Sequence, residues 1–288
     1  MFCLLNRWWF GKEDRIVIDV QDSRVVLVSQ GVGLKDAMSA VVRELPAGVV
    51  QRGLLVDTAA LVETVKECLV DVQPRYTRLA AVLSPRASLC VDVTRVTADH
   101  LNGCEYEEMS VSERFSLDSK EYHHRTIPYR THDGQEGHVV IATRRAVLET
   151  WHQLARLLGV ELVAVVPRAY ALLPRLRKDR LDLRNELIVV IDLTEAAVSL
   201  QVYADSRLIR AVVLEELAWS TVHAPLCEIE REMGPQMSDR PKRFVVFGEV
   251  SGPHRAPLDD LCLKLRGAGS IERLEDVTAS AQALLEFI

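Results

Sequence analysis

The sequence predicts an α/β protein with two related lobes. One observation is a strand–Asp–turn–strand unit that occurs twice, in residues 15–28 and 186–203, about half the chain apart. Superposing Asp19 on Asp192 aligns apolar residues in both strands of the unit, namely Val20 with Leu193, Val25 with Val198 and Leu27 with Leu200. The other observation is that further strand-like segments alternate with amphipathic helical segments, as in an α/β fold. We therefore expect each lobe to open with one copy of the unit.

The composition limits the class of protein. A length of 288 residues allows one large or two ordinary domains, and 48% hydrophobic with 26% charged residues is typical of a soluble globular chain. The formal net charge of −6 argues against general binding of nucleic acid, which needs a basic face. The six cysteines are scattered without a C-x-x-C pair. We therefore expect reduced, buried thiols in a cytoplasmic protein.

Residues 1–14 form a leader rich in aromatic and basic side chains. The segment MFCLLNRWWFGK mixes Phe, Leu and Trp with Arg7 and Lys12, which is the composition of an interfacial membrane anchor. Residues 2–12 are therefore a candidate for peripheral membrane contact. The segment lacks the long apolar stretch and the small-residue cleavage site of a secretory signal. The alternative is a leader whose aromatic side chains pack on the first strand, and both interpretations stay open.

The first half of the chain is expected to alternate strands and helices. After the first unit, residues 34–45 continue as a helix or a strand, and residues 49–56 form a short hairpin. Asp57 occupies the N-cap position of a helix, because apolar residues recur behind it at helical spacing. Two candidate strands follow, at residues 77–83 and 88–96.

The middle of the chain contains a hairpin signal and the clearest helix. Asp133-Gly134 is a turn signal between strand-like residues 122–131 and 138–143. A helix then carries an apolar stripe that includes Trp151, and Gly159 stands at its C-terminal cap. The remaining expected elements are strands at 160–166, 208–214 and 244–247 and helices at 168–176 and 258–265.

These elements divide the chain into three parts. Residues 1–14 are the leader, residues 15–184 are a first lobe with a small inserted subdomain at about 77–143, and residues 185–288 are a shortened second lobe. A basic run at residues 175–184 lies between the lobes. It is interpreted as a solvated linker, with contact to anionic lipid as the alternative.

The duplicated unit resembles the two phosphate-binding hairpins of the actin-like ATPase superfamily. Within that superfamily the order of segments is similar to PilM, the cytoplasmic actin-like protein of type IV pilus assembly. The resemblance covers about residues 15–214 and is carried by Val17–Asp19 with Val25–Val28, by Pro46–Val50 with Gly53–Asp57, and by Val139–Arg144 with Pro167–Leu173. MshI-like and BfpC-like pilus proteins and the cytoplasmic part of the type II secretion L protein are equally similar.

The resemblance implies an actin-like fold of two ribonuclease H-like lobes, with a reduced helical subdomain in the second lobe. It also implies a scaffold at the cytoplasmic face of the inner membrane, in the platform of a pilus or a type II secretion system. Such a scaffold would bind the cytoplasmic tail of a bitopic, PilN-like partner. The tail would lie in a groove between the core of the first lobe and the inserted subdomain.

The residues of the hairpin turns argue against ATPase chemistry. An actin-like site needs glycine in both turns, because only a residue without Cβ lets backbone N–H groups close on phosphates. Here the turns are residues 20–23 and 193–196, and neither contains glycine, while Asp22 and Glu195 add negative charge beside a polyphosphate. The family's adenosine-binding signature is a strand followed by a pair of glycines. Here the strand at 244–247 is followed by Gly248 and Glu249, so Glu249 replaces the second glycine.

We therefore predict a non-catalytic protein with a vestigial nucleotide site. The vestigial candidates are Asp19, Ser23, Asp192, Thr194 and Gly248. Asp19 and Asp192 could hold a hydrated Mg²⁺ through water, but the capping of turns explains both aspartates without a metal. The alternatives are an ATP-binding PilM-type ATPase whose nucleotide state regulates pilus assembly, and a small-molecule kinase of the superfamily.

Two other clusters carry weaker signals. His123, His124, His132 and His138 lie in one stretch, but no Cys joins them in a zinc-like pair, so no metal site is predicted. Ser84 stands in no G-x-S-x-G motif, and we recognise no acyl-transfer nucleophile.

Overall fold

Five strands form the sheet of the first lobe. The computed structural model describes residues 15–30, 38–51, 53–72, 78–92, 118–130, 136–178, 186–194, 197–204, 207–214, 216–233, 239–248, 255–266, 268–274 and 281–282. The strands are β1 (Arg15–Val20), β2 (Arg24–Gln30), β3 (Met38–Glu44), β6 (Arg78–Leu83) and β10 (Glu161–Pro167), in the order β10-β6-β1-β2-β3. β1, β2 and β3 are an antiparallel meander, while β6 runs parallel to both β1 and β10.

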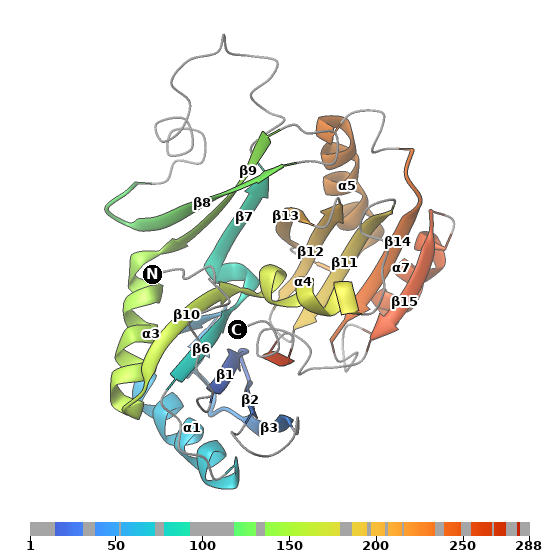
Figure 1. The fold of residues 1–288 in the computed structure, drawn as a ribbon. Coiled ribbons are helices and arrows are strands. Elements are labelled where there is room, and N and C mark those ends of the chain that lie inside the picture. Colours follow the sequence, from blue (N-terminus) through green and yellow to red (C-terminus); the bar gives the residue numbers. More distant parts are fainter. Residues whose placement is uncertain are drawn as a thin grey trace.

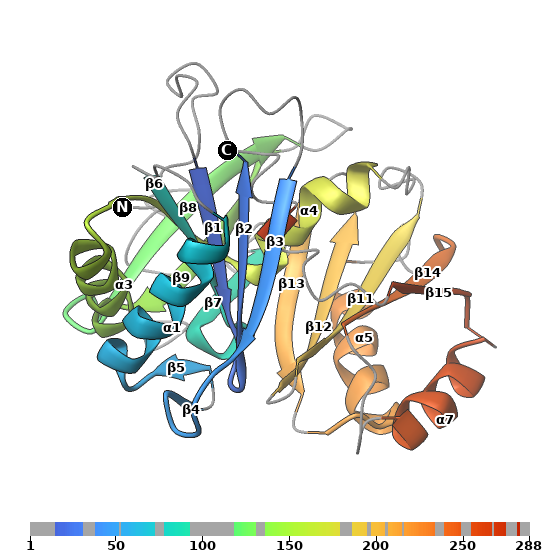
Figure 2. The same ribbon diagram turned by 90° about the horizontal axis from the view of Figure 1, so that it is seen from below.

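Two helices cover one face of this sheet. They are α1 (Thr58–Val72) and α3 (Arg145–Leu158) (Figure 1). A small hairpin of β4 (Val50–Gln51) and β5 (Leu54–Leu55) lies beside them (Figure 2). Leu61 of α1 and Leu154 of α3 are fully buried in one cluster with Ile16 and Ile18 of β1. The apolar stripes of the two helices thus cover one face of the sheet and form part of the core of the first lobe.

The second sheet repeats the topology of the first. Its strands are β11 (Leu187–Thr194), β12 (Ala197–Ala204), β13 (Arg207–Leu214), β14 (Lys242–Phe247) and β15 (Ser270–Leu274), in the order β15-β14-β11-β12-β13. Again three strands form an antiparallel meander and two run parallel to the first of them. Helices α5 (Trp219–Met233) and α7 (Arg255–Leu265) contribute to its core.

The register confirms the duplication that the sequence predicts. Val20 pairs with Val25 at the end of the first hairpin, and Leu193 pairs with Val198 at the end of the second. The aligned positions of the two repeats therefore have the same places in the two sheets.

The inserted strands join the second sheet. They are β7 (Ser88–Asp92), which follows the short 3₁₀ helix η1 (Pro85–Ala87), then β8 (Tyr122–Arg130) and β9 (Glu136–Arg144). β7 pairs with β13 through Cys90 opposite Ala211 and Val91 opposite Arg210, which makes an eight-stranded sheet ending in β13-β7-β9-β8. The insertion thus leaves the first lobe and becomes continuous with the sheet of the second.

Helix α4 (Arg168–Lys178) lies between the two sheets (Figures 1 and 2). Its Ala171 packs in a cluster with Val17 of β1 and with residues of β2, β6 and β10. Its Leu172 and Leu176 pack in another cluster with Ile188 of β11 and with residues of β7, β9, β12 and β14. One helix therefore supplies buried side chains to both lobes.

Local signals in the sequence account for most element boundaries. The Ala60 N–H donates to Asp57 Oδ1 at 3.0 Å, which confirms the predicted N-cap of α1. Gly159 caps α3 with φ of 70°, also as predicted. Residues 34–45 were expected to form a helix or a strand, and the described residues among them form strand β3. Helix α5 and strand β15 were not expected from the sequence.

Several predictions fall outside the described residues. They concern the leader 1–14, the turn at Asp133-Gly134, the side chains of Thr194 and Glu195, and Glu249. Among the described residues, no helix is both long enough and apolar enough to span a membrane.

Gly248 follows β14 in a conformation that only glycine tolerates well. Its φ is 105°, and a Cβ would lie 2.1 Å from the backbone oxygen of Leu193. Gly248→Ala is therefore expected to lower the free energy of unfolding by more than the roughly 1–2 kcal/mol of left-handed strain alone. Gly159→Ala is the matched control, because Gly159 has φ of 70° with nothing within 4 Å of its Cβ position. Urea unfolding of both variants checks this, and equal losses would contradict the close contact at Gly248.

Candidate functional site

The two aspartates of the repeat meet around one buried cation. Arg168 donates from Nη1 to Asp19 Oδ2 and from Nε to Asp192 Oδ2, the latter at 2.7 Å. The side chains of Arg168, Asp19 and Asp192 are 2%, 1% and 0% exposed. The guanidinium group therefore lies between the hairpin strands of the two lobes, where it is shielded from solvent.

The positions of these three residues are set by the carboxyl ends of parallel strands. Asp19 of β1 is level with Val82 of β6, and Val82 is level with Val166 of β10. Arg168 follows two residues after Val166, as the first residue of α4. Because the carboxyl ends of parallel strands meet at one edge of a sheet, Asp19 and Arg168 come together there. Asp192 stands at the equivalent edge of the second sheet.

A buried polar network continues from Asp192 into β12. Gln201 Nε2 lies 3.1 Å from both Asp192 Oδ2 and Ser199 Oγ. The Tyr203 hydroxyl lies 2.6 Å from Gln201 Oε1 and 2.6 Å from the carbonyl oxygen of Ala169 in α4. Asp192 Oδ1 is buried and has no hydrogen-bond partner among the described residues.

The charges of this site are unequal, with one guanidinium and two carboxylates. Burial lowers the pKa of Arg168, but the nearby Asp19 and Asp192 outweigh that effect and raise it. Burial raises the pKa of Asp192, although Arg168 acts in the opposite direction. Both directions agree with a charged Arg168 that neutralises one carboxylate while the other resists ionisation.

The first hairpin turn is occupied by the protein itself. Asp22 Oδ1 accepts a hydrogen bond from the Gly53 N–H at 2.7 Å, and the Ser23 carbonyl oxygen accepts one from the Leu45 N–H at 2.6 Å. The turn is closed by the Gln21 N–H, which donates to the Arg24 carbonyl oxygen at 2.9 Å. In this arrangement Asp22 holds the β4–β5 hairpin against the turn.

The structure brings together only part of the predicted vestigial set. Asp19 and Asp192 share Arg168, and Gly248 packs on Leu193 beside Asp192. Ser23 contributes its backbone carbonyl to the turn. The side chain of Thr194 lies outside the described residues.

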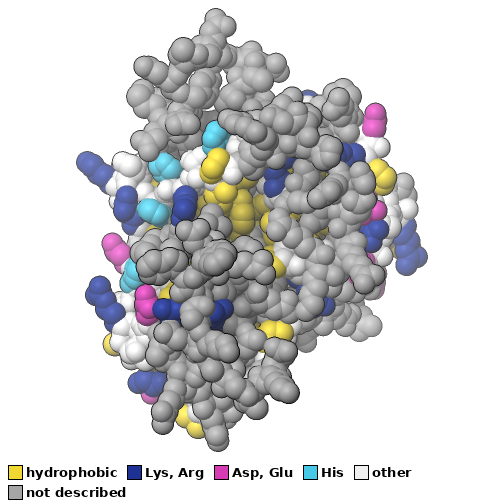
Figure 3. Space-filling view, in the orientation of Figure 1, with side chains coloured by type: hydrophobic (Ala, Val, Ile, Leu, Met, Phe, Trp, Pro, Cys, Tyr) yellow, Lys and Arg dark blue, Asp and Glu magenta, His cyan; other side chains and the backbone are white. Residues whose placement is uncertain are grey.

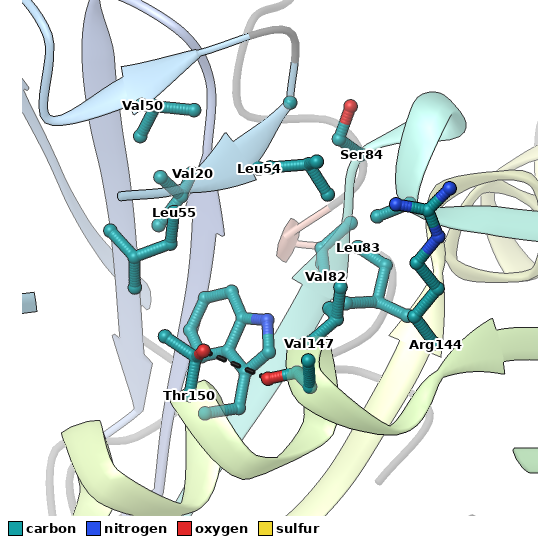
Figure 4. A pocket seen from close by; sticks show the side chains of 14 residues that line it. Val20, Val50, Leu54, Leu55, Val82, Leu83, Ser84, Arg144, Val147 and Thr150 are labelled. Carbon is teal, nitrogen blue, oxygen red and sulfur yellow. Dashed lines mark hydrogen bonds between the residues drawn. The ribbon is translucent and has the colours of Figure 1, made fainter. Parts of the chain in front are cut away.

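A separate pocket of about 170 Å³ opens on the first lobe (Figure 4). Its walls come from the end of β1, the β4–β5 hairpin, the β6–η1 junction, the end of β9 and the start of α3, and no residue of β11 to β15 lines it. The lining is mostly aliphatic and includes Leu54, Leu83, Val147 and Trp151, while Ser84 and Arg144 stand at the points where the chain enters and leaves the inserted strands.

The sequence matches no protein-family model and no curated protein. Solved structures are similar over nearly the whole chain. A PilM–PilN type IV pilus biogenesis complex aligns with a TM-score of 0.69 at 16% identity, over 95% of this chain and 98% of that chain. A Bacteroides thetaiotaomicron protein described as having an actin-like ATPase fold aligns with a TM-score of 0.59 at 14% identity, over 96% of both chains.

The chain has the actin-like ATPase fold. The cytoplasmic domain of EpsL, an inner membrane component of the type II secretion system of Vibrio cholerae, is also similar, with a TM-score of 0.54 at 12% identity over 96% of both chains. These likenesses confirm the predicted fold class of two duplicated lobes. Since a shared fold does not settle chemistry, the function has to be argued from the site.

Sequence reasoning missed Arg168, the residue that joins the two hairpin aspartates. The turn at Pro167-Arg168 was read only as the start of a short helix. A signal was present, because Arg168 follows the end of a buried parallel strand, as Asp19 and Asp192 mark the ends of theirs. Charged residues at neighbouring strand ends are expected to face each other.

A separate group of titratable side chains lies on the surface of the inserted strands. Histidines and basic residues lie on the side formed by β8, β9 and α3, at the left of the face in Figure 3. His123 and His124 are neighbours on β8 and so point to opposite faces. Within the described residues no group of three or more metal-binding side chains occurs, and His132 lies outside them.

Four cysteines are described. Cys68, Cys90 and Cys262 are buried, and burial raises the pKa of the Cys90 thiol to about 12. Cys227 is exposed, with Sγ 3.5 Å from Nε2 of His223 on the same helix. The expectation of buried thiols is confirmed for three of them and is wrong for Cys227.

Proposed function

We propose that this protein is a non-catalytic actin-like scaffold of an inner-membrane platform for pilus biogenesis or type II secretion. The observation that carries the proposal is the contact of Arg168 with both hairpin aspartates. In an actin-like cleft the phosphates and their metal ion would need the space between those hairpins. A side chain of the protein fills that space here, and its charge is already neutralised by the protein.

Binding of Mg-ATP would have to break this arrangement. Polyphosphate would enter beside two carboxylates, in a region shielded from water where like charges repel strongly. Neither hairpin turn offers the glycine backbone that could compensate, and the Asp22 carboxylate is engaged by Gly53. The cleft therefore favours the scaffold over the alternative of an ATPase whose nucleotide state regulates assembly.

The pocket on the first lobe supplies a candidate site for a partner. Its volume of about 170 Å³ is smaller than the roughly 300–1,000 Å³ of sites for drug-sized ligands. It suits one or two apolar side chains of a peptide. It also lies where the core of the first lobe meets the inserted strands, which agrees with the position that the PilM resemblance implies for a partner tail. We infer that the cytoplasmic tail of a bitopic, PilN-like protein inserts an apolar side chain here.

The location and the organisation of the chain follow from this proposal. A scaffold that holds such a tail would lie at the cytoplasmic face of the inner membrane, with residues 2–12 as a further candidate for membrane contact. Residues 15–184 and 185–288 would be its two lobes, and about residues 77–143 its inserted subdomain.

Isothermal titration of the purified protein with Mg-ATP tests the non-catalytic half of the proposal. No binding heat is expected at micromolar to millimolar nucleotide. Micromolar binding that is lost in Asp19→Ala or Asp192→Ala would sink the scaffold interpretation and favour the ATPase. Co-purification with single-span pilus or secretion proteins tests the other half, and failure to recover any of them would count against it.

A further inference from the structure

Among the described residues, three features of the chain itself tie the two lobes together. Arg168 contacts one aspartate from each sheet. Helix α4 packs apolar residues into clusters on both sides, with Ala171 on one and Leu172 on the other. The pairing of β7 with β13 makes the inserted strands continuous with the second sheet. Opening of the cleft would expose the first two contacts to water and strain the third.

The distances in the buried network of Asp192, Gln201, Tyr203 and Ala169 show which atoms must carry a hydrogen. Tyr203 has one hydroxyl hydrogen, yet its oxygen lies 2.6 Å from two acceptors, the Ala169 carbonyl oxygen and Gln201 Oε1. One of these two contacts therefore contains no hydrogen. The nitrogen and oxygen of a side-chain amide can be exchanged without moving other atoms. After this exchange, Gln201 donates to Tyr203 and Tyr203 donates to Ala169, so both contacts are satisfied.

After this exchange, the contact that lacks a hydrogen atom is the one between Gln201 and Asp192. The side-chain oxygen of Gln201 then lies 3.1 Å from Asp192 Oδ2, and two acceptors face each other. A proton on Asp192 resolves this contact, because the acid then donates to Gln201. With that proton, every close contact along Asp192, Gln201, Tyr203 and Ala169 contains a hydrogen. Burial also raises the pKa of Asp192, which favours the protonated acid.

We propose that the contact of Asp19, Arg168 and Asp192 is an interlobe latch in which Arg168 and Asp19 carry the charges and Asp192 is the neutral member. The charged groups are then one opposite pair. Among the described residues, Tyr203 on β12 is the titratable group that continues the network, and Tyr170 on α4 and Cys90 on β7 lie near Tyr203; burial raises the pKa of Tyr203 and of Cys90, so both stay neutral. The latch keeps the cleft closed without nucleotide. It rests on the proposed function only in that the cleft holds no ligand.

Two isosteric variants test the assignment of charges. Asp19→Asn removes the charge that balances the buried guanidinium, and Asp192 could replace that charge only by losing the proton that satisfies Gln201. The unfolding equilibrium constant is therefore expected to rise roughly 100-fold or more. Asp192→Asn replaces a neutral acid by a neutral amide, so the constant is expected to change by less than about fivefold. Urea unfolding at pH 7 measures both. Equal destabilisation would overturn the assignment, and no destabilisation by either variant would overturn the latch.

The pH dependence gives a second measurement, which needs only wild type and Asp192→Asn. Because the folded pKa of Asp192 is raised above 3.8, the folded protein keeps a proton that the unfolded chain loses. The stability of wild type relative to Asp192→Asn is therefore expected to fall as pH rises above 3.8, by up to about tenfold in the equilibrium constant per pH unit. The fall should end once pH exceeds the folded pKa. A difference independent of pH would overturn the protonated Asp192.

These results are distinguishable from a failure of the proposed function. If Mg-ATP binds while the two asparagine variants differ as expected, the scaffold proposal fails and the latch stands. If Mg-ATP does not bind and the two variants are equivalent, the scaffold proposal stands and the latch fails.

Discussion

Arg168→Met is expected to lower the free energy of unfolding by about 3–5 kcal/mol, because it leaves the buried Asp19 carboxylate without its cation and removes the hydrogen bond to Asp192. Methionine retains most of the length and apolar volume of the side chain, so the effect reports the lost charge more than a cavity. The two aspartates are 1% and 0% exposed, and water cannot easily replace the guanidinium. Urea unfolding followed by circular dichroism measures the change.

The reason for this loss is testable in a double variant. Adding Asp19→Asn to Arg168→Met removes both charges of the latch and is expected to recover much of the stability, since an absent buried pair costs less than a broken one. Lys264→Met is the control. Lys264 and Asp260 pair at 2.7 Å on the surface, half exposed, and breaking that pair is expected to cost within about 0.5 kcal/mol. If Arg168→Met lost no more than Lys264→Met, the buried cation would have no structural role.

The two hairpins were predictable from the sequence, because the same local apolar pattern occurs twice in the chain. The alternation of apolar residues after Asp19 and Asp192 specified both hairpins and their register, because a shift by one residue would turn every buried side chain outward. The caps at Asp57 and Gly159 fixed the ends of two helices for equally local reasons. Two copies of one pattern also implied two sheets of the same topology.

The centre of the site was not predictable in this way. Asp19 and Arg168 are 149 positions apart in the sequence, and their contact depends on the order of β1, β6 and β10 in the sheet. The pairing of β7 with β13 depends on how the insertion crosses between lobes, which no periodicity records. The turn residues could show that glycine is missing, but only the sheet order shows what fills the cleft instead.

A bulky substitution in the pocket on the first lobe is expected to weaken partner binding. Thr150→Phe is expected to weaken binding of a PilN-like tail peptide by at least about tenfold, or 1.4 kcal/mol. Thr150 is half-buried in the pocket wall, and its hydroxyl is already bonded to the Ala146 carbonyl oxygen at 2.9 Å (Figure 4). A phenyl ring there would occupy much of the 170 Å³ that the tail needs. Fluorescence anisotropy with a labelled peptide of the cytoplasmic tail of a single-span platform protein measures the affinity.

His152→Phe is the matched control for this variant. It introduces the same ring two positions further along α3, at an exposed residue that does not line the pocket. Both variants should unfold at urea concentrations close to that of wild type, so a loss of affinity in Thr150→Phe alone would locate the tail in the pocket. Equal affinity of Thr150→Phe and wild type would place the tail elsewhere. Since the pocket shares no residue with Arg168 or the two aspartates, neither variant should change the response to Mg-ATP, which separates partner binding from the closed cleft.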